Sequence, residues 1–322
     1  MRELLAMLVA FAASAALVRA LLPLLRRLKF GQAIYELAPE AHKKKQGTPI
    51  MGGLAIAGGG LLSALVFLAA GDGDRAPVLA FIALALGNLL IGFADDMTKI
   101  RRGKNGGLSP KQKLVFQTAL ALAFSAWCAA RPDVGTAIRI PFLRSELDLG
   151  LLYVPLMTFV IVGTTNSANL LDGLDGLLSS VALVDFGTLA FLAAAFAVPN
   201  LSSACAALMG GCMGFLLFNS HPAAVFMGDT GSMFIGGAVS AAALLLREPL
   251  LLILIAFWMM MSSLSDLIQF AYFRKTHGKR FFKMAPIHHH FELCGLSETK
   301  IVTMYQLTTI ALCALALLGT VV

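Results

Sequence analysis

Charged residues are scarce in this chain, and their scarcity excludes an ordinary soluble domain. Asp, Glu, Lys and Arg make up 13% of the 322 residues, against about 25% in a soluble globular domain. Hydrophobic residues make up 58%, and the mean hydropathy is +0.81. This composition predicts an integral membrane protein.

The chain also lacks the cysteine spacings of a zinc site or a disulfide framework, and it lacks any nucleic-acid-binding motif. Its five cysteines have no paired spacing, and four of them fall inside apolar runs, which predicts small buried residues. The net charge of +7 is explained by basic loops between the apolar runs. We therefore expect the lipid bilayer, and no nucleic acid, as a partner.

Ten apolar runs are candidate membrane spans, because a helix needs about 20 apolar residues to cross a bilayer. The runs are Leu4–Leu22, Met51–Ala70, Val78–Ala94, Leu114–Ala130, Leu151–Gly163, Leu177–Val198, Leu201–Phe218, Ser232–Leu246, Leu250–Phe273 and Ile301–Val321. The first run resembles a signal peptide, but the basic residues that soon follow it favour a retained helix. The sequence predicts an all-α integral membrane protein of about ten transmembrane helices, forming one polytopic domain over residues 1–322.

Basic residues are concentrated on one side of the membrane if ten spans alternate. The loops after the first, third and ninth runs each hold six Lys or Arg residues, whereas the opposite loops are short or acidic. The positive-inside rule then makes the basic side cytoplasmic and places both termini outside. One outside segment, residues 136–149, alternates apolar and polar residues in part, which predicts a small hairpin on the outer surface.

Five polar clusters fall on the predicted cytoplasmic side. They are residues 43–53 (KKKQGTPIMGG), 92–99 (GFADDMTK), 166–180 (NSANLLDGLDGLLSS), 219–231 (NSHPAAVFMGDTG) and 284–292 (MAPIHHHFE). A channel or carrier places polar residues near mid-membrane, where this chain has few, chiefly Asp185 and Asp266. The pattern favours a cytoplasmic active site, and a divalent-cation or anion transporter is the alternative.

The third cluster carries polar side chains at a regular spacing: Asn166, Asn169, Asp172 and Asp175. Asp172 and Asp175 are three residues apart and would share one face of a helical turn. Each is followed by glycine, which permits close backbone approach. We interpret the cluster as a polar floor for a phosphorylated or metal-bound ligand, with helix caps and a tight interhelical turn as the alternative.

Asp95 and Asp96 directly follow the third apolar run, and Asp229 precedes the eighth. Adjacent carboxylates repel and favour a nearby cation, for which Mg²⁺ is the hard, oxygen-seeking choice. Lys99 could neutralise one carboxylate or bind phosphate. Asp229 falls on the same side of the membrane as the other acids, and we predict that it is a metal ligand. The N–H groups at the start of the helix attract anions, so we expect a diphosphate nearby. A solvated helix end and a simple cap are the alternatives.

His288, His289 and His290 follow a proline in a basic loop. Adjacent histidines cannot all face one metal on a regular element, and the cysteine ligands of a zinc site are absent nearby. We expect these imidazoles to contact phosphate or sugar instead. Lys45 and Lys111 are candidates for substrate binding, with attraction of anionic lipid headgroups as the alternative.

Together the five clusters resemble the phospho-N-acetylmuramoyl-pentapeptide transferase family, within the polyprenyl-phosphate N-acetylhexosamine-1-phosphate transferases. GTPIMGG, GFADDMTK, NSANLLDGLDGL, FMGDTGS and APIHHHFE stand in the family's order and spacing across nearly the whole chain. APIHHHFE argues against the relatives that transfer GlcNAc phosphate, which are the second candidate. Leu296 departs from the Trp that the family often has, and Met304-Tyr305 departs from Arg-Phe.

The resemblance implies an enzyme of peptidoglycan synthesis in the bacterial inner (cytoplasmic) membrane. It would transfer phospho-MurNAc-pentapeptide from UDP-MurNAc-pentapeptide to undecaprenyl phosphate, giving lipid I and UMP, with Mg²⁺ as cofactor and as a homodimer. Catalytic roles fall on Asp95, Asp96, Lys99, Asp229 and His289, with Asp229 at the metal. Substrate-binding roles fall on Lys45, Lys111, Asn166, Asn169, Asp172, Asp175, Asn219, Phe226, His288 and His290. Direct displacement and a covalent intermediate both stay open.

Overall fold

The computed structural model describes residues 1–27, 45, 47–102, 106–143 and 145–321. The helices run in the order α1 (Arg2–Arg27), α3 (Gly53–Ala69), α4 (Ala76–Arg102), α5 (Pro110–Ala130), α6 (Tyr153–Leu171), α7 (Leu177–Ala195), α8 (Pro199–Asn219), α9 (Gly228–Leu245), α10 (Leu252–Ile255), α11 (Phe257–Lys275), α12 (Ile287–Leu293) and α13 (Glu298–Val321). Short 3-10 turns, η1 (Gly150–Leu152) and η2 (Pro249–Leu251), precede α6 and α10. The basic residues Lys29, Lys43, Lys44 and Lys104 lie outside the described part of the chain.

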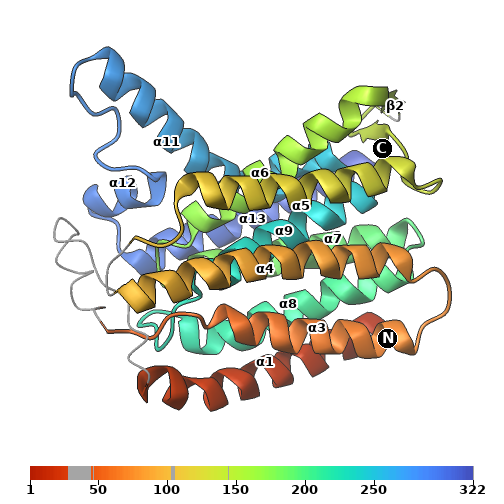
Figure 1. Ribbon diagram of the computed structural model, residues 1–322, viewed down its shortest axis with the longest axis horizontal. Helices are drawn as coiled ribbons and strands as arrows, with labels where there is room; N and C mark the ends of the chain where they lie inside the picture. The colour runs from red at the N-terminus through yellow and green to blue at the C-terminus, as the bar shows by residue number, and fades with distance from the viewer. Residues whose placement is uncertain (28–44, 46, 103–105, 144, 322) are drawn as a thin grey trace.

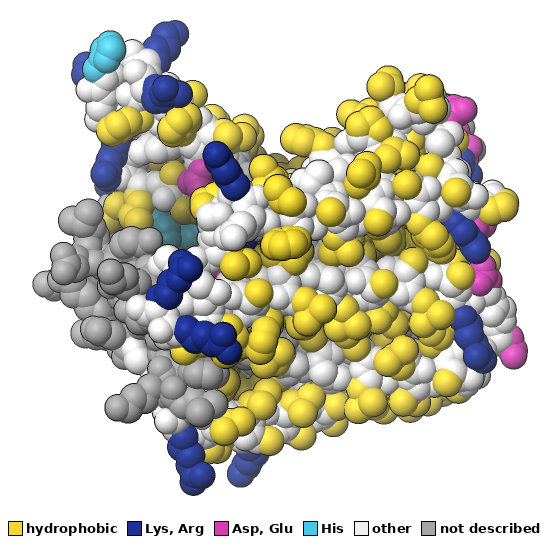
Figure 2. Space-filling model, in the orientation of Figure 1, with side chains coloured by type: hydrophobic (Ala, Val, Ile, Leu, Met, Phe, Trp, Pro, Cys, Tyr) yellow, Lys and Arg dark blue, Asp and Glu magenta, His cyan; other side chains and the backbone are white. Residues whose placement is uncertain are grey.

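The long helices of this bundle have the length and apolarity of membrane spans. Among the described residues, seven helices are long and apolar enough to cross a membrane, or up to eight if a bent pair is one span. Hydrophobic side chains cover most of the face seen in Figure 2, and charged side chains gather toward its two ends. The chain is therefore an all-α, multi-pass membrane protein. The count of ten spans stays a prediction, since α3 and α9 fall outside this group.

The predicted span Leu250–Phe273 is broken in the structure, because α10 and α11 are separated by a bend of 83°, and the pair counts as one span only if the bend is included. The break falls at Ala256, between Ile255 and Phe257. Immediately after it, the Trp258 ring stacks on Tyr305 of α13 at 3.8 Å, and Trp258 Nε1 donates a hydrogen bond of 2.6 Å to Thr308 Oγ1. These contacts attach the start of α11 to α13, and α11 then leaves the bundle (Figure 1).

Helix α9 is the centre of the bundle. Every residue from Thr230 to Leu245 is buried, and α4 and α6 both pack along it. Small residues let its first turn meet its neighbours closely. A Cβ at Gly53 of α3 would lie 2.2 Å from the Gly231 Cα, and one at Gly92 of α4 would lie 2.1 Å from the Asp229 carbonyl oxygen. The end of α4 and the starts of α3 and α9 therefore converge.

The predicted hairpin is present within residues 136–149. Strands β1 (Ala137–Ile140) and β2 (Ser145–Asp148) pair antiparallel, with Ala137 opposite Asp148 and Ile140 opposite Ser145. Arg247, between α9 and α10, attaches the hairpin to the bundle, since its Nη2 lies 2.6 Å from Glu146 Oε2 and its carbonyl oxygen accepts from Arg139 N. The hairpin lies at the opposite end of the bundle from α12 (Figure 1).

Candidate active site

Three carboxylates meet where α4 ends and α9 begins. Asp95 and Asp96 are buried on α4, and Asp229 is partly buried in the first turn of α9. One oxygen of each lies within 4.8 Å of the others, a spacing that could hold a metal ion. We call Asp95, Asp96 and Asp229 the acidic cluster. It depends on Gly92, whose missing side chain lets α4 lie against the backbone of Asp229.

Two lysines form ion pairs with the acidic cluster. Lys99 Nζ lies 2.7 Å from Asp95 Oδ2 and 3.1 Å from Asp229 Oδ1, and Lys113 Nζ lies 2.6 Å from Asp229 Oδ2. Lys99 was predicted for this place, whereas Lys113 of α5 was not among the predicted site residues. The predicted Lys111 has an exposed side chain. Lys111 and Lys113 are two positions apart in the sequence and so point to different sides of α5.

The adjacent aspartates have different surroundings. Asp96 accepts hydrogen bonds from Thr230 N (2.9 Å) and Thr230 Oγ1 (2.7 Å), so it binds the N–H groups at the start of α9. Asp95 accepts from Leu108 N at 2.8 Å and lines a cavity of about 580 Å³. Asp95 therefore faces the space where a ligand can bind, and Asp96 holds two helices together.

This cavity joins the acidic cluster to α5 and α6. Its lining includes Asp95, Lys99, Lys113, Gln117, Asn166, Asn169 and Asp229. Carboxylate and amide oxygens are the donors that a hard divalent cation prefers. The ammonium groups of Lys99 and Lys113 lie among those oxygens, where the carboxylates of the acidic cluster require positive charge. The residues present therefore fit a divalent metal ion bound by Asp229 and Asp95.

The predicted row of polar residues is divided between a helix and a turn. Helix α6 continues to Leu171, well past the predicted end at Gly163, and this brings Asn166 and Asn169 into the cavity. Asn169 Nδ2 donates to Asp229 Oδ1 at 3.0 Å. Asp172 caps the end of α6. Burial, followed by the charges of Asp229, Asp96 and Asp175, raises the pKa of Asp172 to about 8.

A second charged cluster lies beside the turn between α6 and α7. Lys45 Nζ contacts Asp175 Oδ1 at 2.7 Å and Glu298 Oε1 at 2.5 Å. His221 Nδ1 lies 3.1 Å from Asp175 Oδ2 and 3.2 Å from Glu298 Oε2. Lys45 and Asp175 were predicted site residues. His221 and Glu298 were missed: His221 lies inside the fourth polar cluster, but neither residue belongs to a spacing typical of a metal or catalytic site.

The predicted residues Asn219 and Phe226 hold backbone segments beside these clusters. Asn219 Oδ1 accepts from Gly176 N (3.1 Å) and Ser179 Oγ (2.8 Å), and its Nδ2 donates to Val225 O. The Phe226 backbone pairs with the loop before α3, since Phe226 N donates to Pro49 O and Phe226 O accepts from Gly52 N. The described loops around the site are therefore tied to one another.

The three histidines of α12 point to different neighbours, as their adjacency predicts. His288 is fully buried, and its Nε2 would lie 2.2 Å from a Cβ at Gly173 in the α6–α7 turn. His289 Nδ1 lies 2.7 Å from Glu292 Oε2, and His290 Nδ1 accepts from Lys283 N at 3.1 Å. His288 packs on the turn that carries Asp172 and Asp175, whereas His289 contacts Glu292 and His290 contacts Lys283, so the three imidazoles have different neighbours.

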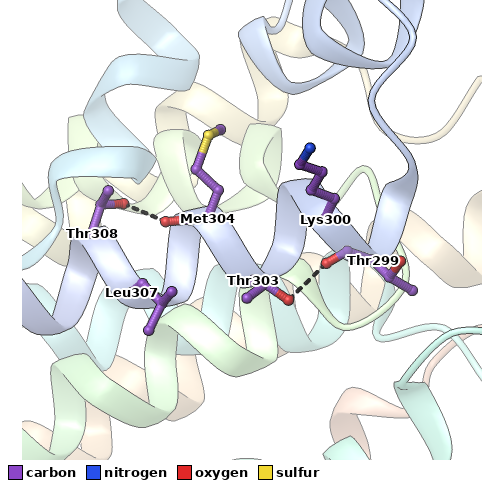
Figure 3. Close-up of a pocket in the computed structure, with 6 residues that line it drawn as sticks. All are labelled: Thr299, Lys300, Thr303, Met304, Leu307 and Thr308. Carbon is purple, nitrogen blue, oxygen red and sulfur yellow. Dashed lines mark hydrogen bonds between the residues drawn. The ribbon is translucent and has the colours of Figure 1, made fainter.

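A second cavity, of about 530 Å³, follows the first half of α13. Figure 3 shows its lining residues: Thr299, Lys300, Thr303, Met304, Leu307 and Thr308. Thr303 and Thr308 donate their hydroxyl protons to carbonyl oxygens one turn earlier. Within the described chain, the predicted site residues lie elsewhere. Met304, one of the two departures from the family pattern, therefore lies outside the acidic cluster.

Comparison with known proteins agrees with this site. A family model described as glycosyl transferase family 4 matches residues 78–247, which include the whole acidic cluster. Proteins named phospho-N-acetylmuramoyl-pentapeptide-transferase from Bacillus anthracis (strain A0248), Bacillus thuringiensis (strain Al Hakam) and Bacillus cereus (strain AH187) are each 42% identical over 297 residues. Each alignment covers 92% of this chain and 91% of the relative.

The fold and the site define a multi-pass membrane transferase. The chain belongs to glycosyl transferase family 4 and, within it, to the phospho-N-acetylmuramoyl-pentapeptide transferases. The resemblance carried by the five sequence motifs is confirmed.

Proposed function

We propose that the protein transfers phospho-MurNAc-pentapeptide from UDP-MurNAc-pentapeptide to undecaprenyl phosphate. The products are lipid I and UMP, the first membrane step of peptidoglycan synthesis. The meeting of Asp95, Asp96 and Asp229 with Lys99 and Lys113 beside one cavity carries this proposal. Transfer between two phosphates needs opposite charges at fixed positions more than it needs a strong base.

The proposed cofactor is Mg²⁺, held by Asp229 with Asp95 beside it. When bound, it neutralises charge that develops on the diphosphate as UMP leaves. Lys99 and Lys113 neutralise the remaining carboxylate charge and bind phosphate oxygens. Asp95 orients the attacking lipid phosphate or accepts its residual proton. We favour direct displacement over an aspartyl intermediate, because the lipid phosphate is already anionic near neutral pH.

The remaining predicted residues are proposed to bind the substrates. Lys45, Asp175, Asn219 and Phe226 are assigned to the nucleotide, supported by their position around the α6–α7 turn. His288, with His289 and His290 on the same short helix, is assigned to the sugar-phosphate end. Asn166, Asn169 and Asp172 line the path between the two ends. Lys111 is assigned to phosphate attraction at the rim.

The proposed topology is one polytopic domain of ten spans with both termini outside, in the bacterial cytoplasmic membrane. Helices α3 and α9 supply two spans beyond the seven long helices, and the bent α10–α11 pair supplies one. This places the acidic cluster on the cytoplasmic side, where a nucleotide donor is available. A homodimer is also proposed, from the family resemblance.

Purified protein with Mg²⁺ and undecaprenyl phosphate tests the choice of substrate. We expect UMP release with UDP-MurNAc-pentapeptide and little with UDP-GlcNAc. Release with UDP-GlcNAc alone would favour the GlcNAc-phosphate branch of the superfamily. Absence of release with either donor, in protein that unfolds cooperatively, would refute the proposed activity.

A further inference from the structure

Gln117 is a buried polar residue of α5 that lies outside all five polar clusters. Its side chain is 2% exposed and lines the cavity beside the acidic cluster. It is four residues after Lys113 and therefore on the same face of the helix. Gln117 Oε1 accepts a hydrogen bond of 3.0 Å from Asn166 Nδ2, whereas Gln117 Nε2 has no hydrogen-bond partner among the described residues.

An amide donor in this position has the chemistry of a phosphate contact. A buried donor without a partner costs about 1–3 kcal/mol, so glutamine is a poor choice here for packing alone. The cavity also holds the ammonium groups of Lys99 and Lys113, which attract an anion. A neutral amide can donate to a phosphate oxygen, and it adds no further positive charge to a site that already holds two lysines.

The position of Gln117 along α5 favours the lipid substrate over the UDP substrate as the phosphate that it contacts. Leu114 lines the same cavity and is 52% exposed, and its neighbours Val115 and Phe116 are exposed apolar residues. The cavity therefore borders the lipid-facing surface of α5. The cluster of Lys45 and Asp175, proposed for the nucleotide, contributes nothing to the described lining of this cavity. A phosphate that carries a hydrocarbon chain is the substrate that can enter over Leu114.

We propose that Gln117 binds the phosphate of the polyprenyl acceptor through Nε2–H, while its Oε1 fixes the orientation of Asn166. This inference rests on the proposed transferase function and adds the side chain that holds the acceptor beside Asp95. It also explains why a glutamine, with one acceptor and two donor protons, stands at this position, since Asn166 uses the oxygen and leaves the amide protons free.

Two substitutions separate the roles of the two ends of the side chain. Gln117→Glu keeps an acceptor for Asn166 but removes the amide donor, and its negative charge repels phosphate. Gln117→Met has a similar volume and removes both donor and acceptor. Ser125→Ala is the matched control, because Ser125 is buried on α5 eight residues further on and its hydroxyl also has no partner within the described chain.

Steady-state UMP release is measured while undecaprenyl phosphate and UDP-MurNAc-pentapeptide are varied in turn. Loss of a hydrogen bond to a charged phosphate predicts that both Gln117 variants raise KM for undecaprenyl phosphate by about tenfold or more. The KM for the UDP donor should stay near the wild-type value, and Ser125→Ala should leave both constants unchanged. Thermal unfolding in detergent checks that each variant is folded.

Three other results would overturn the inference while leaving the transferase in place. The first is an active wild type with KM for the lipid unchanged in both folded variants. The second is a rise confined to KM for the UDP donor, which assigns Gln117 to that substrate. The third is a raised KM for the lipid in Gln117→Met with a wild-type KM in Gln117→Glu. That result would assign Gln117 only the contact to Asn166. An inactive wild type would instead refute the proposed function.

Discussion

At the scale of single residues, adjacent aspartates carry separable tasks. Asp96 accepts the N–H and hydroxyl of Thr230 and so stabilises the start of α9. Asp95 faces the cavity and two ammonium groups. The sequence could predict that this pair lies near a cation. It could not predict which carboxylate faces the ligand, because that depends on the rotation of α4 against α9.

Asp95→Asn and Asp96→Asn should therefore differ in stability. Asn at position 96 turns an amide donor or a weaker acceptor toward Thr230, which should lower the free energy of unfolding by about 1–3 kcal/mol. Asn at position 95 removes a negative charge from a crowded acidic cluster and should leave stability unchanged or higher. Thermal unfolding of both variants in the same detergent measures this difference. Equal melting temperatures would contradict the separate roles.

Lys113 and Lys111 form a matched pair on α5. Lys113 Nζ contacts Asp229 and Asp95, whereas Lys111 is exposed. Lys113→Ala should reduce kcat for UMP release by about a hundredfold, since a charge-assisted contact is worth a few kcal/mol in a partly buried site. Lys111→Ala should change it less than about threefold, as expected for an exposed charge. A loss of kcat that is larger for Lys111→Ala than for Lys113→Ala would instead place the main phosphate contact at the rim of the cavity.

At the scale of elements, the converging ends of α4 and α9 build the acidic cluster. Apolar runs in the sequence located both helices, and the charged motifs located their ends. The sequence did not reveal that α6 extends through Asn169, because polar residues in its last turns resemble a loop. It did not reveal the bend at Ala256 either, because Trp258 and Tyr305 meet only in the folded molecule.

Gly92→Ala should disrupt this convergence. Its Cβ would lie 2.1 Å from the Asp229 carbonyl oxygen, which is backbone and cannot rotate away. We expect a loss of about 1–3 kcal/mol in stability, as for other overpacked positions, together with a lower kcat. Gly163→Ala is the control, because a Cβ there has no atom within 4 Å in the described chain. Equal behaviour of the two variants would contradict the close packing of α4 on α9.

At the scale of the whole molecule, charge separates the two ends of an apolar bundle. Helix α12 and the end of α4, which carries Asp95 and Asp96, lie at one end, and the hairpin β1–β2 lies at the other (Figure 1). The sequence predicted this division, because basic loops and polar motifs recur on the same side of successive spans. The alternation of apolar and polar residues was enough to predict the hairpin. It did not predict that Arg247 attaches the hairpin to the bundle.

The proposed orientation predicts which end reacts with a membrane-impermeant thiol reagent. In a background carrying Cys294→Ser, which removes the exposed native cysteine, Asp72→Cys between α3 and α4 should be labelled in intact cells. Lys279→Cys between α11 and α12 should be labelled only after the membrane is opened. Both positions are exposed, so a reversed pattern would place the acidic cluster outside the cytoplasm.

The Mg²⁺ activation curve for UMP release tests the metal-dependent centre most directly. Purified wild-type protein, Asp95→Asn and Asp229→Asn are treated with chelator and then titrated with Mg²⁺ in the presence of both substrates. We predict no release without metal, and a far higher Mg²⁺ requirement for Asp229→Asn than for Asp95→Asn, because Asp229 is the proposed ligand of the ion. Full activity of the chelated wild type, or the same Mg²⁺ dependence in both variants, would contradict this account.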